Sequence, residues 1–340
     1  MANYTNAAVL NPVTGLQMQK RALEAGVLAT GCQGIDDCLK GGFRASAGIT
    51  EVSGKSSSGK TQLCLQLAIN CQKSIERGGL GGGALYVFCE GTFPVKRLQE
   101  LAAAQPATLG IDGDQKTAKD ITDRIFVQHA DDCEQLWNLL SGSRLTSMLQ
   151  TGAVKLVVID SITSIIRGEF STSRRDLSDR SDILFSFSGR MKRLASTFNC
   201  LFVVINQVSG VFPPAPGAPR ASCMGTSFLP NGQESTFDSF LAPLKVTPSL
   251  GIAWSTCVTT RVLLQRLVDA DKTTYTNGTI ADCTNTHMKR TARGNKGTSR
   301  GTVTEFSPVP RELRVLLSPY IAHNASCRFF VTRNGLQDKL

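Results

Sequence analysis

The chain lacks long apolar runs, closely paired cysteines and clustered histidines, and each absence excludes a class of protein. No apolar stretch approaches the roughly 20 residues that a membrane-spanning helix needs. The first residues have neither the basic region nor the apolar region of a secretory signal. We therefore expect a protein of the cytosol or the nucleus that does not enter the membrane.

None of the eleven cysteines forms a C-x-x-C pair, and the three histidines are scattered along the chain. Several cysteines, including Cys64, Cys71 and Cys200, lie inside apolar runs, where a free thiol behaves as a small hydrophobic side chain. The cysteines therefore indicate reduced, structural thiols, and the sequence predicts no zinc site.

The composition has an excess of positive charge. Lysine and arginine number 37 against 27 aspartates and glutamates, which gives a net charge of +10. A basic excess of this kind suits a polyanionic partner such as a nucleic acid. Many basic proteins bind no nucleic acid, so the charge favours such a partner without establishing it.

From Leu28 onward, apolar strand candidates alternate with amphipathic helices, which predicts an α/β fold with a mostly parallel sheet. The strand candidates are Ile49–Val52, Ala84–Phe88, Ile125–Gln128, Lys155–Ile159, Leu201–Ile205, Arg261–Leu267 and Leu313–Leu316. The central candidates are continuous apolar runs, as expected for strands that are covered on both faces.

The spacing also predicts helices and two insertions. A helix from Thr61 to about Arg77 should end at a glycine pair, and an apolar stripe at spacings of three and four over 184–198 indicates a helix packed on the sheet. Residues 209–247 are rich in proline, and residues 270–309 are rich in Thr, Gly and Asn. Both segments are typical of long surface loops or disordered insertions.

We therefore expect an N-terminal linker, residues 1–27, followed by one core domain, residues 28–340. The second insertion carries a basic cluster at about Lys289–Arg300, which suits a solvated linker, a nuclear import signal or a DNA-binding tail.

A phosphate-binding loop is the clearest motif. The octet Gly54-Lys55-Ser56-Ser57-Ser58-Gly59-Lys60-Thr61 matches G-x-x-x-x-G-K-[ST] and lies between a predicted strand and a predicted helix. Its glycines let the backbone N–H groups point at phosphate oxygens, and the helix presents its positive end to the same anion. Lys60 would reach the β- and γ-phosphates of ATP, and Thr61 would give a hydroxyl ligand to Mg²⁺.

Polar residues at the ends of other predicted strands complete the expected site. Asp160 ends a buried strand, which predicts a second Mg²⁺ ligand at the carboxyl edge of the sheet. Glu90 and Gln207 follow two further strands, where a carboxylate can polarise the attacking water and an amide can touch the γ-phosphate. From its spacing alone, Glu90 could equally be an ordinary acid near a helix N-terminus.

At this point the residues resemble a known family. The segments Leu28–Cys32, Gly41-Gly42, Glu90–Phe93, Val158–Ser161 and Val204–Gln207, in this order around the phosphate loop, resemble the RecA-type recombinases of eukaryotes and archaea. Phe93–Leu98 and the serine-rich loop resemble the recombinase-paralogue branch. The resemblance implies a RecA-like P-loop NTPase core, a twisted and mostly parallel sheet flanked by helices, with a C-terminal β-rich extension.

The resemblance also implies residue roles. Glu90 would be the catalytic glutamate, acting with Lys60; Gln207 would be the γ-phosphate sensor, and Arg97 would pack on adenine. Single-stranded DNA would be bound by two loops, of which the second begins after Gln207. The first would span about Arg167–Arg180 and include Arg167, Arg174, Arg175 and Arg180. The alternative for these arginines is a solvated surface run interleaved with aspartates.

The implied function is homologous-recombination repair of double-strand breaks in the nucleus, by a slow DNA-dependent ATPase. The implied partners are DNA, other recombinase paralogues in a heteromeric complex, and the main strand-exchange recombinase. Two alternatives are an autonomous recombinase that forms filaments on single-stranded DNA, and a scaffold that binds ATP with little hydrolysis. The short N-terminal linker has no room for the helical domain of the strand-exchange enzymes, which argues against the former.

Overall fold

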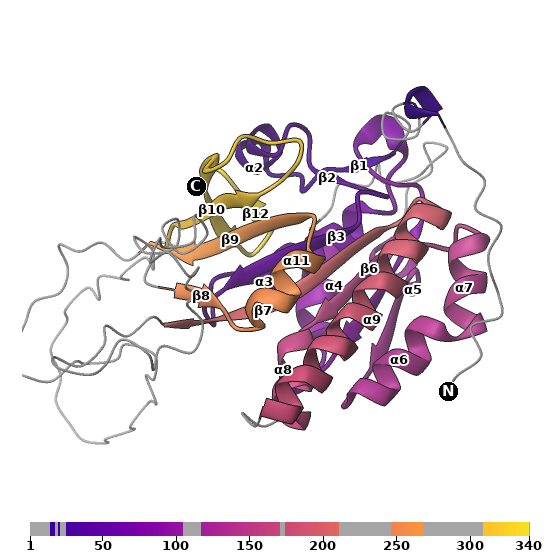
Figure 1. Ribbon diagram of the computed structural model, residues 1–340. Coiled ribbons are helices and arrows are strands. Elements are labelled where there is room, and N and C mark those ends of the chain that lie inside the picture. The colour runs from indigo at the N-terminus through magenta and orange to yellow at the C-terminus, as the bar shows by residue number, and fades with distance from the viewer. Residues whose placement is uncertain are drawn as a thin grey trace, which may run out of the picture.

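A computed structural model describes residues 14–17, 20, 25–104, 117–170, 174–210, 246–267 and 309–339. Its centre is one twisted sheet of ten strands with helices on both faces (Figure 1). The predicted α/β fold with a mostly parallel sheet is therefore confirmed. Most of the N-terminal linker, most of both insertions and the basic cluster lie outside the described residues.

Six neighbouring strands of the sheet run parallel. In spatial order they are β9 (Thr260–Arg266), β3 (Ile49–Gly54), β7 (Leu201–Gly210), β6 (Val154–Asp160), β4 (Gly83–Phe88) and β5 (Ile125–His129). Each corresponds to a strand expected from the sequence. Since all six run in one direction, their carboxyl ends meet at one edge of the sheet.

The remaining strands of this sheet are antiparallel to their neighbours. They are β10 (Arg311–Leu317), β11 (Ser326–Thr332) and β12 (Gly335–Gln337), which extend the sheet beyond β9, and β8 (Val246–Pro248), which pairs with the end of β7. The predicted C-terminal β-rich extension is thus confirmed. A separate two-stranded sheet joins β1 (Val27–Leu28) to β2 (Phe43–Arg44).

Two apolar cores separate the sheet from its helices. On one face pack α2 (Gln33–Cys38), α3 (Lys60–Asn70), α4 (Val95–Ala103) and α5 (Ala118–Asp123). On the other pack α6 (Cys133–Ser141), α7 (Ser143–Gln150), α8 (Ile162–Glu169), α9 (Arg174–Phe198) and α11 (Gly251–Cys257). Strand β6 shows why its apolar run is continuous: Leu156 and Val158 enter the first core, whereas Val157 and Ile159 enter the second.

Two helices differ in extent from the sequence expectation. Helix α3 ends at Asn70 instead of about Arg77, and a short 3₁₀ turn follows at Ile75–Arg77. The glycine-rich loop after it turns back under the helix, and the N–H of Leu80 donates to the Cys71 carbonyl at 3.0 Å. This loop satisfies carbonyl groups at the helix end that a longer helix would have used.

Helix α9 begins earlier than expected. The first DNA-binding loop was predicted at about 167–180, but α8 continues through Glu169 and α9 starts at Arg174. No proline or glycine interrupts residues 174–188, so nothing in this stretch opposes a helix. The expectation of a loop over this whole range was therefore wrong. The predicted apolar stripe on α9 is confirmed, since Leu184, Phe187 and Met191 are buried.

Gln66 in α3 connects the beginning and the end of the core. Its side-chain amide donates to the Thr30 carbonyl at 2.7 Å and accepts the N–H of Leu336 at 2.7 Å. Gly335 passes so close that a Cβ there would lie 2.3 Å from the Gln66 oxygen. These contacts hold the C-terminal strands beside the helix that follows the phosphate loop. None of the described helices combines the length and the apolar content that a membrane span requires.

A buried ion pair connects β3 to β9. The Arg261 guanidinium donates to Glu51 Oε2 from Nε at 2.7 Å and from Nη2 at 2.6 Å, and both side chains are fully buried. Glu51 Oε1 accepts a further hydrogen bond from the Asn206 amide on β7 at 2.8 Å. Because a buried carboxylate needs such partners, these contacts hold β3, β9 and β7 in fixed relative positions.

Arg261→Met should lower the free energy of unfolding by about 3–5 kcal/mol, because it leaves the Glu51 charge buried and without its guanidinium. Urea denaturation followed by circular dichroism measures this loss. Arg328→Met is the control, since Arg328 is exposed on β11. A loss no larger than that of the control would show that the pair does not stabilise the core. The double variant Glu51→Leu/Arg261→Met should recover part of the loss.

Candidate functional site

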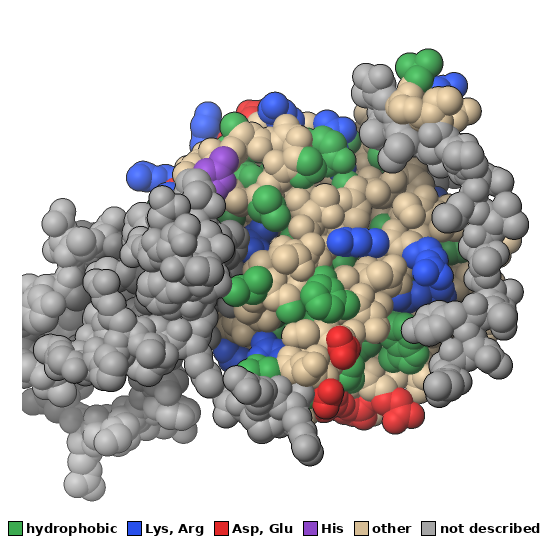
Figure 2. Space-filling view, in the orientation of Figure 1, with side chains coloured by type: hydrophobic (Ala, Val, Ile, Leu, Met, Phe, Trp, Pro, Cys, Tyr) green, Lys and Arg blue, Asp and Glu red, His purple; other side chains and the backbone are tan. Residues whose placement is uncertain are grey.

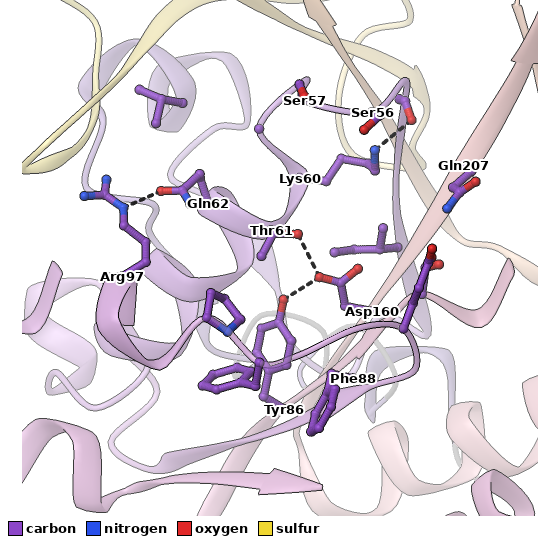
Figure 3. Close-up of a pocket in the computed structure, with 18 of the residues that line it drawn as sticks. Ser56, Ser57, Lys60, Thr61, Gln62, Tyr86, Phe88, Arg97, Asp160 and Gln207 are labelled. Atoms are coloured by element: carbon purple, nitrogen blue, oxygen red, sulfur yellow. Dashed lines mark hydrogen bonds between the residues drawn. The ribbon is translucent and has the colours of Figure 1, made fainter. Parts of the chain in front are cut away.

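A cavity of about 1070 Å³ lies at the carboxyl edge of the parallel strands (Figure 3). The sequence-predicted residues that line it are Gly54, Ser56, Ser57, Gly59, Lys60, Thr61, Glu90, Arg97, Asp160 and Gln207. Residues from five separate segments of the chain thus meet in one place. Of the predicted loop, Ser58 is buried and Lys55 is exposed, and neither lines the cavity.

The loop requires glycine at both glycine positions of its motif, Gly54 and Gly59. Gly54 has φ 155°, and a Cβ there would lie 2.5 Å from the Leu264 carbonyl oxygen. Gly59 has φ 106°, in the left-handed region that favours glycine, and it caps the N-terminus of α3. The helix therefore directs its positive end and its first N–H groups at the cavity, an arrangement that binds phosphate or another anion.

Lys60 lies in the first turn of α3 with its ammonium group over the loop. Its Nζ donates to the carbonyl oxygens of Gly54 and Lys55, each at 2.8 Å. Burial lowers the pKa of Lys60, and the nearby Asp160 carboxylate acts in the opposite direction. Both contacts are to neutral acceptors, so an anionic ligand in the cavity would be a stronger partner for this cation.

Asp160, Thr61 and Tyr86 form a cluster of oxygens at the end of β6. Asp160 Oδ2 accepts the Thr61 hydroxyl at 2.8 Å and the Tyr86 hydroxyl at 2.7 Å. Burial, with Asp160 nearby, raises the pKa of Tyr86, so this phenol stays a hydrogen-bond donor. Hard oxygen donors from Thr61 and Asp160 fit Mg²⁺, which takes one or two protein ligands and completes its shell with phosphates and water. Within the described residues, no group of three or more His, Cys, Asp or Glu could hold a metal by itself.

Gln207 lies on β7 directly beside Gly54 in the parallel register. Its backbone N–H donates to the Thr163 hydroxyl at 3.1 Å, and that hydroxyl donates to Asn206 Oδ1 at 2.7 Å. Asn206 in turn binds the buried Glu51. Since Thr163 and Asn206 are fully buried, a continuous hydrogen-bonded chain sets the position of the Gln207 backbone.

Glu90 lies just beyond β4, is exposed, and lines the cavity. The segment after it is anchored by Phe93, whose ring packs edge-on against Tyr86 with centroids 5.0 Å apart. Because Glu90 follows β4 at the carboxyl edge of the sheet and the next segment is anchored by Phe93, Glu90 lies at the cavity on the same edge as Asp160. Its catalytic role stays a prediction.

Arg97 on α4 joins the cavity wall to the C-terminal hairpin. Its Nε donates to Gln62 Oε1 at 2.7 Å, and its Nη atoms donate to the carbonyl oxygens of Thr332 at 2.6 Å and Arg333 at 2.9 Å. A further contact joins it to Glu100 at 3.0 Å. These hydrogen bonds lie in the guanidinium plane and so do not themselves oppose stacking on its faces; the adenine-packing role of Arg97 stays a prediction.

Of the arginines predicted to bind DNA, Arg167 and Arg180 do not line the cavity. Arg167 is exposed at the end of α8, whereas Arg180 is half-buried and donates to the Ser249 carbonyl at 3.2 Å. Burial and the nearby Arg167 lower the pKa of Arg180. Arg174 and Arg175 lie in the first turn of α9, and their side chains are outside the described residues. On the face in Figure 2, the described Lys and Arg side chains occupy separate positions, not one continuous patch.

Sequence reasoning missed several residues of the site. Tyr86 sits inside an apolar strand and looks like an ordinary core residue, and Thr163 lies in a helix that carries no motif of its own. The buried pair left a usable signal, since Glu51 and Arg261 are charges inside apolar strand candidates. No such signal was available for Gln62 and Arg311, because their place in the cavity depends on tertiary packing.

Arg97→Ala should loosen the C-terminal hairpin, because it removes the donors to the Thr332 and Arg333 carbonyls. Hydrogen exchange read by mass spectrometry should show the amides between β11 and β12 exchanging about tenfold faster. Lys96→Ala is the matched control, since Lys96 is exposed on the same helix. Equal exchange in both variants would mean that Arg97 does not hold the hairpin.

Comparisons with known proteins agree with this architecture. The Rad51 family profile matches residues 21–222, more than half of the chain. The chain is 30% identical over 317 residues to the DNA repair protein XRCC3 homolog of Arabidopsis thaliana, covering 91% of this chain and 92% of that protein. It is 32% identical over 312 residues to the DNA repair protein XRCC3 of Mus musculus, covering 91% and 74%.

An archaeal relative shows the same family at a greater distance. The chain is 34% identical over 205 residues to the DNA repair and recombination protein RadA of Cenarchaeum symbiosum, covering 60% of this chain and 48% of that protein. The resemblance to RecA-type recombinases and their paralogues is therefore confirmed: the chain belongs to the Rad51 family.

Proposed function

We propose that this protein binds and hydrolyses ATP as an accessory factor in homologous-recombination repair of DNA double-strand breaks. The observation that carries the proposal is the convergence of the glycine loop, Asp160, Glu90 and Gln207 on one cavity. Alignment with relatives named as DNA repair proteins over about nine-tenths of the chain supports the biological setting.

The proposed chemistry is attack of water on the γ-phosphorus, in line with the bond to the ADP oxygen that breaks. Glu90 orients this water and accepts its proton, while Lys60 stabilises the charge that develops on the phosphate oxygens. The products are ADP and inorganic phosphate. In the structure, the Lys60 ammonium lies against neutral carbonyls of the loop, from which a triphosphate would draw it.

Thr61 and Asp160 are the residues that would hold Mg²⁺, because both present hard oxygens at the end of β6. When bound, Mg²⁺ neutralises charge on the β- and γ-phosphates. The Tyr86 hydroxyl orients the Asp160 carboxylate by donating to Oδ2, and the other carboxylate oxygen accepts no hydrogen bond from the described residues, so it can face a ligand.

We further propose that Gln207 reports loss of the γ-phosphate to the chain beyond β7. The Thr163–Asn206–Glu51 chain of hydrogen bonds holds its backbone, so a movement of Gln207 is transmitted to buried groups in three elements. The carbonyl of Gln207 also accepts the N–H of Ser249, whose own carbonyl receives Arg180. A change at the phosphate therefore has a route to both ends of the segment 211–245.

DNA, other recombinase paralogues and the main strand-exchange recombinase are the proposed partners, and the nucleus is the proposed site of action. Arg167, Arg174, Arg175 and Arg180 are proposed to contact DNA phosphates without reading its sequence. For Arg180, contact with DNA would compete with the hydrogen bond that it makes to Ser249. This competition would couple DNA binding to the chain that follows Gln207.

Glu90→Gln and Lys60→Ala together test the proposal. Glu90→Gln should keep ATP affinity within about threefold and lower hydrolysis by about 100-fold or more, because it removes only the base. Lys60→Ala should weaken ATP binding by about tenfold or more, since it removes a charged phosphate partner. Fluorescent-nucleotide titration, phosphate release and repair of cells lacking the protein are the measurements.

Glu134→Gln, an exposed change on α6, is the control and should behave as the unchanged protein. If Lys60→Ala bound ATP as tightly as the unchanged protein, the assignment of the cavity would be wrong. Full repair by a hydrolysis-deficient Glu90→Gln protein would instead favour a scaffold that only binds ATP.

A further inference from the structure

Arg311, the first residue of β10, lies on the wall of the cavity and has no role in the chemistry described so far. It packs against the cap of α3: a Cβ on Gly59 would lie 3.3 Å from Arg311 Cδ and 3.5 Å from its Nε. A residue some 250 positions away in sequence from the phosphate loop thus brings its guanidinium beside the loop's helix N-terminus.

The guanidinium of Arg311 has an unused donor. Its Nη1 donates to the Val309 carbonyl at 3.0 Å, but its Nε is buried and has no hydrogen-bond partner among the described residues. No carboxylate of the described chain pairs with it, whereas Arg261 and Arg314 each bind a glutamate. Arg314 also has an unpaired Nε, but it does not line the cavity. Buried donors in proteins are normally hydrogen-bonded, so this one indicates an acceptor that is not part of the fold, such as a ligand.

A second cation lies directly across from it. In the antiparallel register of β9 and β10, Arg311 is the partner of Arg266, so the two side chains share a face of the sheet. Burial, and then Arg266, lower the pKa of Arg311. Like charges at directly opposed positions destabilise a sheet, and an anion bound between or beside them removes that cost.

We propose that Arg311 is a phosphate-binding residue of the nucleotide cavity, supplied by β10 of the same chain. Its guanidinium donates to a phosphate oxygen of the nucleoside polyphosphate that the loop Gly54–Thr61 holds. The inference rests on the proposed function and adds a cation to Lys60 at the same site. The planar fork of arginine matches phosphate oxygens, so lysine at this position would restore charge but not geometry.

The test is nucleotide binding by the purified full-length chain, measured with a fluorescent non-hydrolysable ATP analogue and Mg²⁺. Arg311→Gln should weaken binding about tenfold or more, and Arg311→Lys by a smaller factor, because a charge-assisted hydrogen bond is lost in the first and only distorted in the second. Arg328→Gln, the same charge change at an exposed site on β11, should bind as the unchanged protein.

Thermal unfolding separates a binding role from a structural one. Without nucleotide, Arg311→Gln should have an equal or higher Tm, because the repulsion from Arg266 is gone. With the analogue, its Tm should rise less than that of the unchanged protein. A lower Tm without nucleotide, combined with an undiminished rise on binding, would assign Arg311 to the fold and overturn the proposal. If the glutamine variant does not fold, Arg311→Lys carries both measurements.

Three further outcomes are decisive. If Lys60→Ala loses binding while Arg311→Gln and Arg311→Lys keep it, the Arg311 proposal is wrong and the proposed function stands. If Arg311→Gln leaves nucleotide affinity unchanged but weakens binding of single-stranded DNA, the unused donor serves DNA phosphate instead, which equally overturns it. An unchanged protein that binds no nucleotide would remove the proposed function itself.

Discussion

The parallel hydrogen-bonding register of the central strands is the constraint on which the site depends. It places Gly54 directly beside Gln207 across β3 and β7, and Phe88 directly beside Asp160 across β4 and β6. Side chains alternate between the two faces of a strand. A register shift of one residue in either strand pair would therefore move a polar side chain at the strand end to the other face of the sheet. The register is itself secured by two separate apolar cores, one on each face of β6, so the same burial that folds the sheet also aligns its reactive edge.

Helix α3 extends this alignment to segments that are far apart in sequence. Its N-terminus carries Gly59 and Lys60, its first turn presents Gln62 to Arg97, and its middle residue Gln66 holds both Thr30 and Leu336. A single helix therefore binds the loop, the α4 wall and the C-terminal strands. This explains why an antiparallel extension, which would otherwise only lengthen the sheet, becomes part of the cavity. The end of β11 lines the cavity and contacts Arg97, and β12 contacts α3.

The sequence was sufficient for the central sheet and for the phosphate loop, because both depend on local patterns. Continuous apolar runs identified the parallel strands, and polar residues after three of them, Glu90, Asp160 and Gln207, marked the shared edge. The start of α9 was not predicted, because arginine-rich polar sequence suits a loop and a helix equally until Leu184 and Phe187 dock on the sheet. The contact of Arg97 with Thr332 and the position of Arg311 beside Gly59 could not be predicted from the sequence either, because both depend on long-range packing alone.

Three arginines differ in how far protein groups satisfy their donors, and this difference separates a structural role from a binding role. Arg97 and Arg311 line the cavity, whereas Arg261 does not. Arg261 is fully buried against Glu51, so its charge is neutralised by an ion pair within the core. Arg97 is held by carbonyl and amide oxygens that fix the plane of its guanidinium. Arg311 keeps an N–H without a protein acceptor and faces another cation in Arg266. An unsatisfied donor that lies beside an anion-binding helix end, as at Arg311, suits a polyphosphate ligand better than a purely structural role.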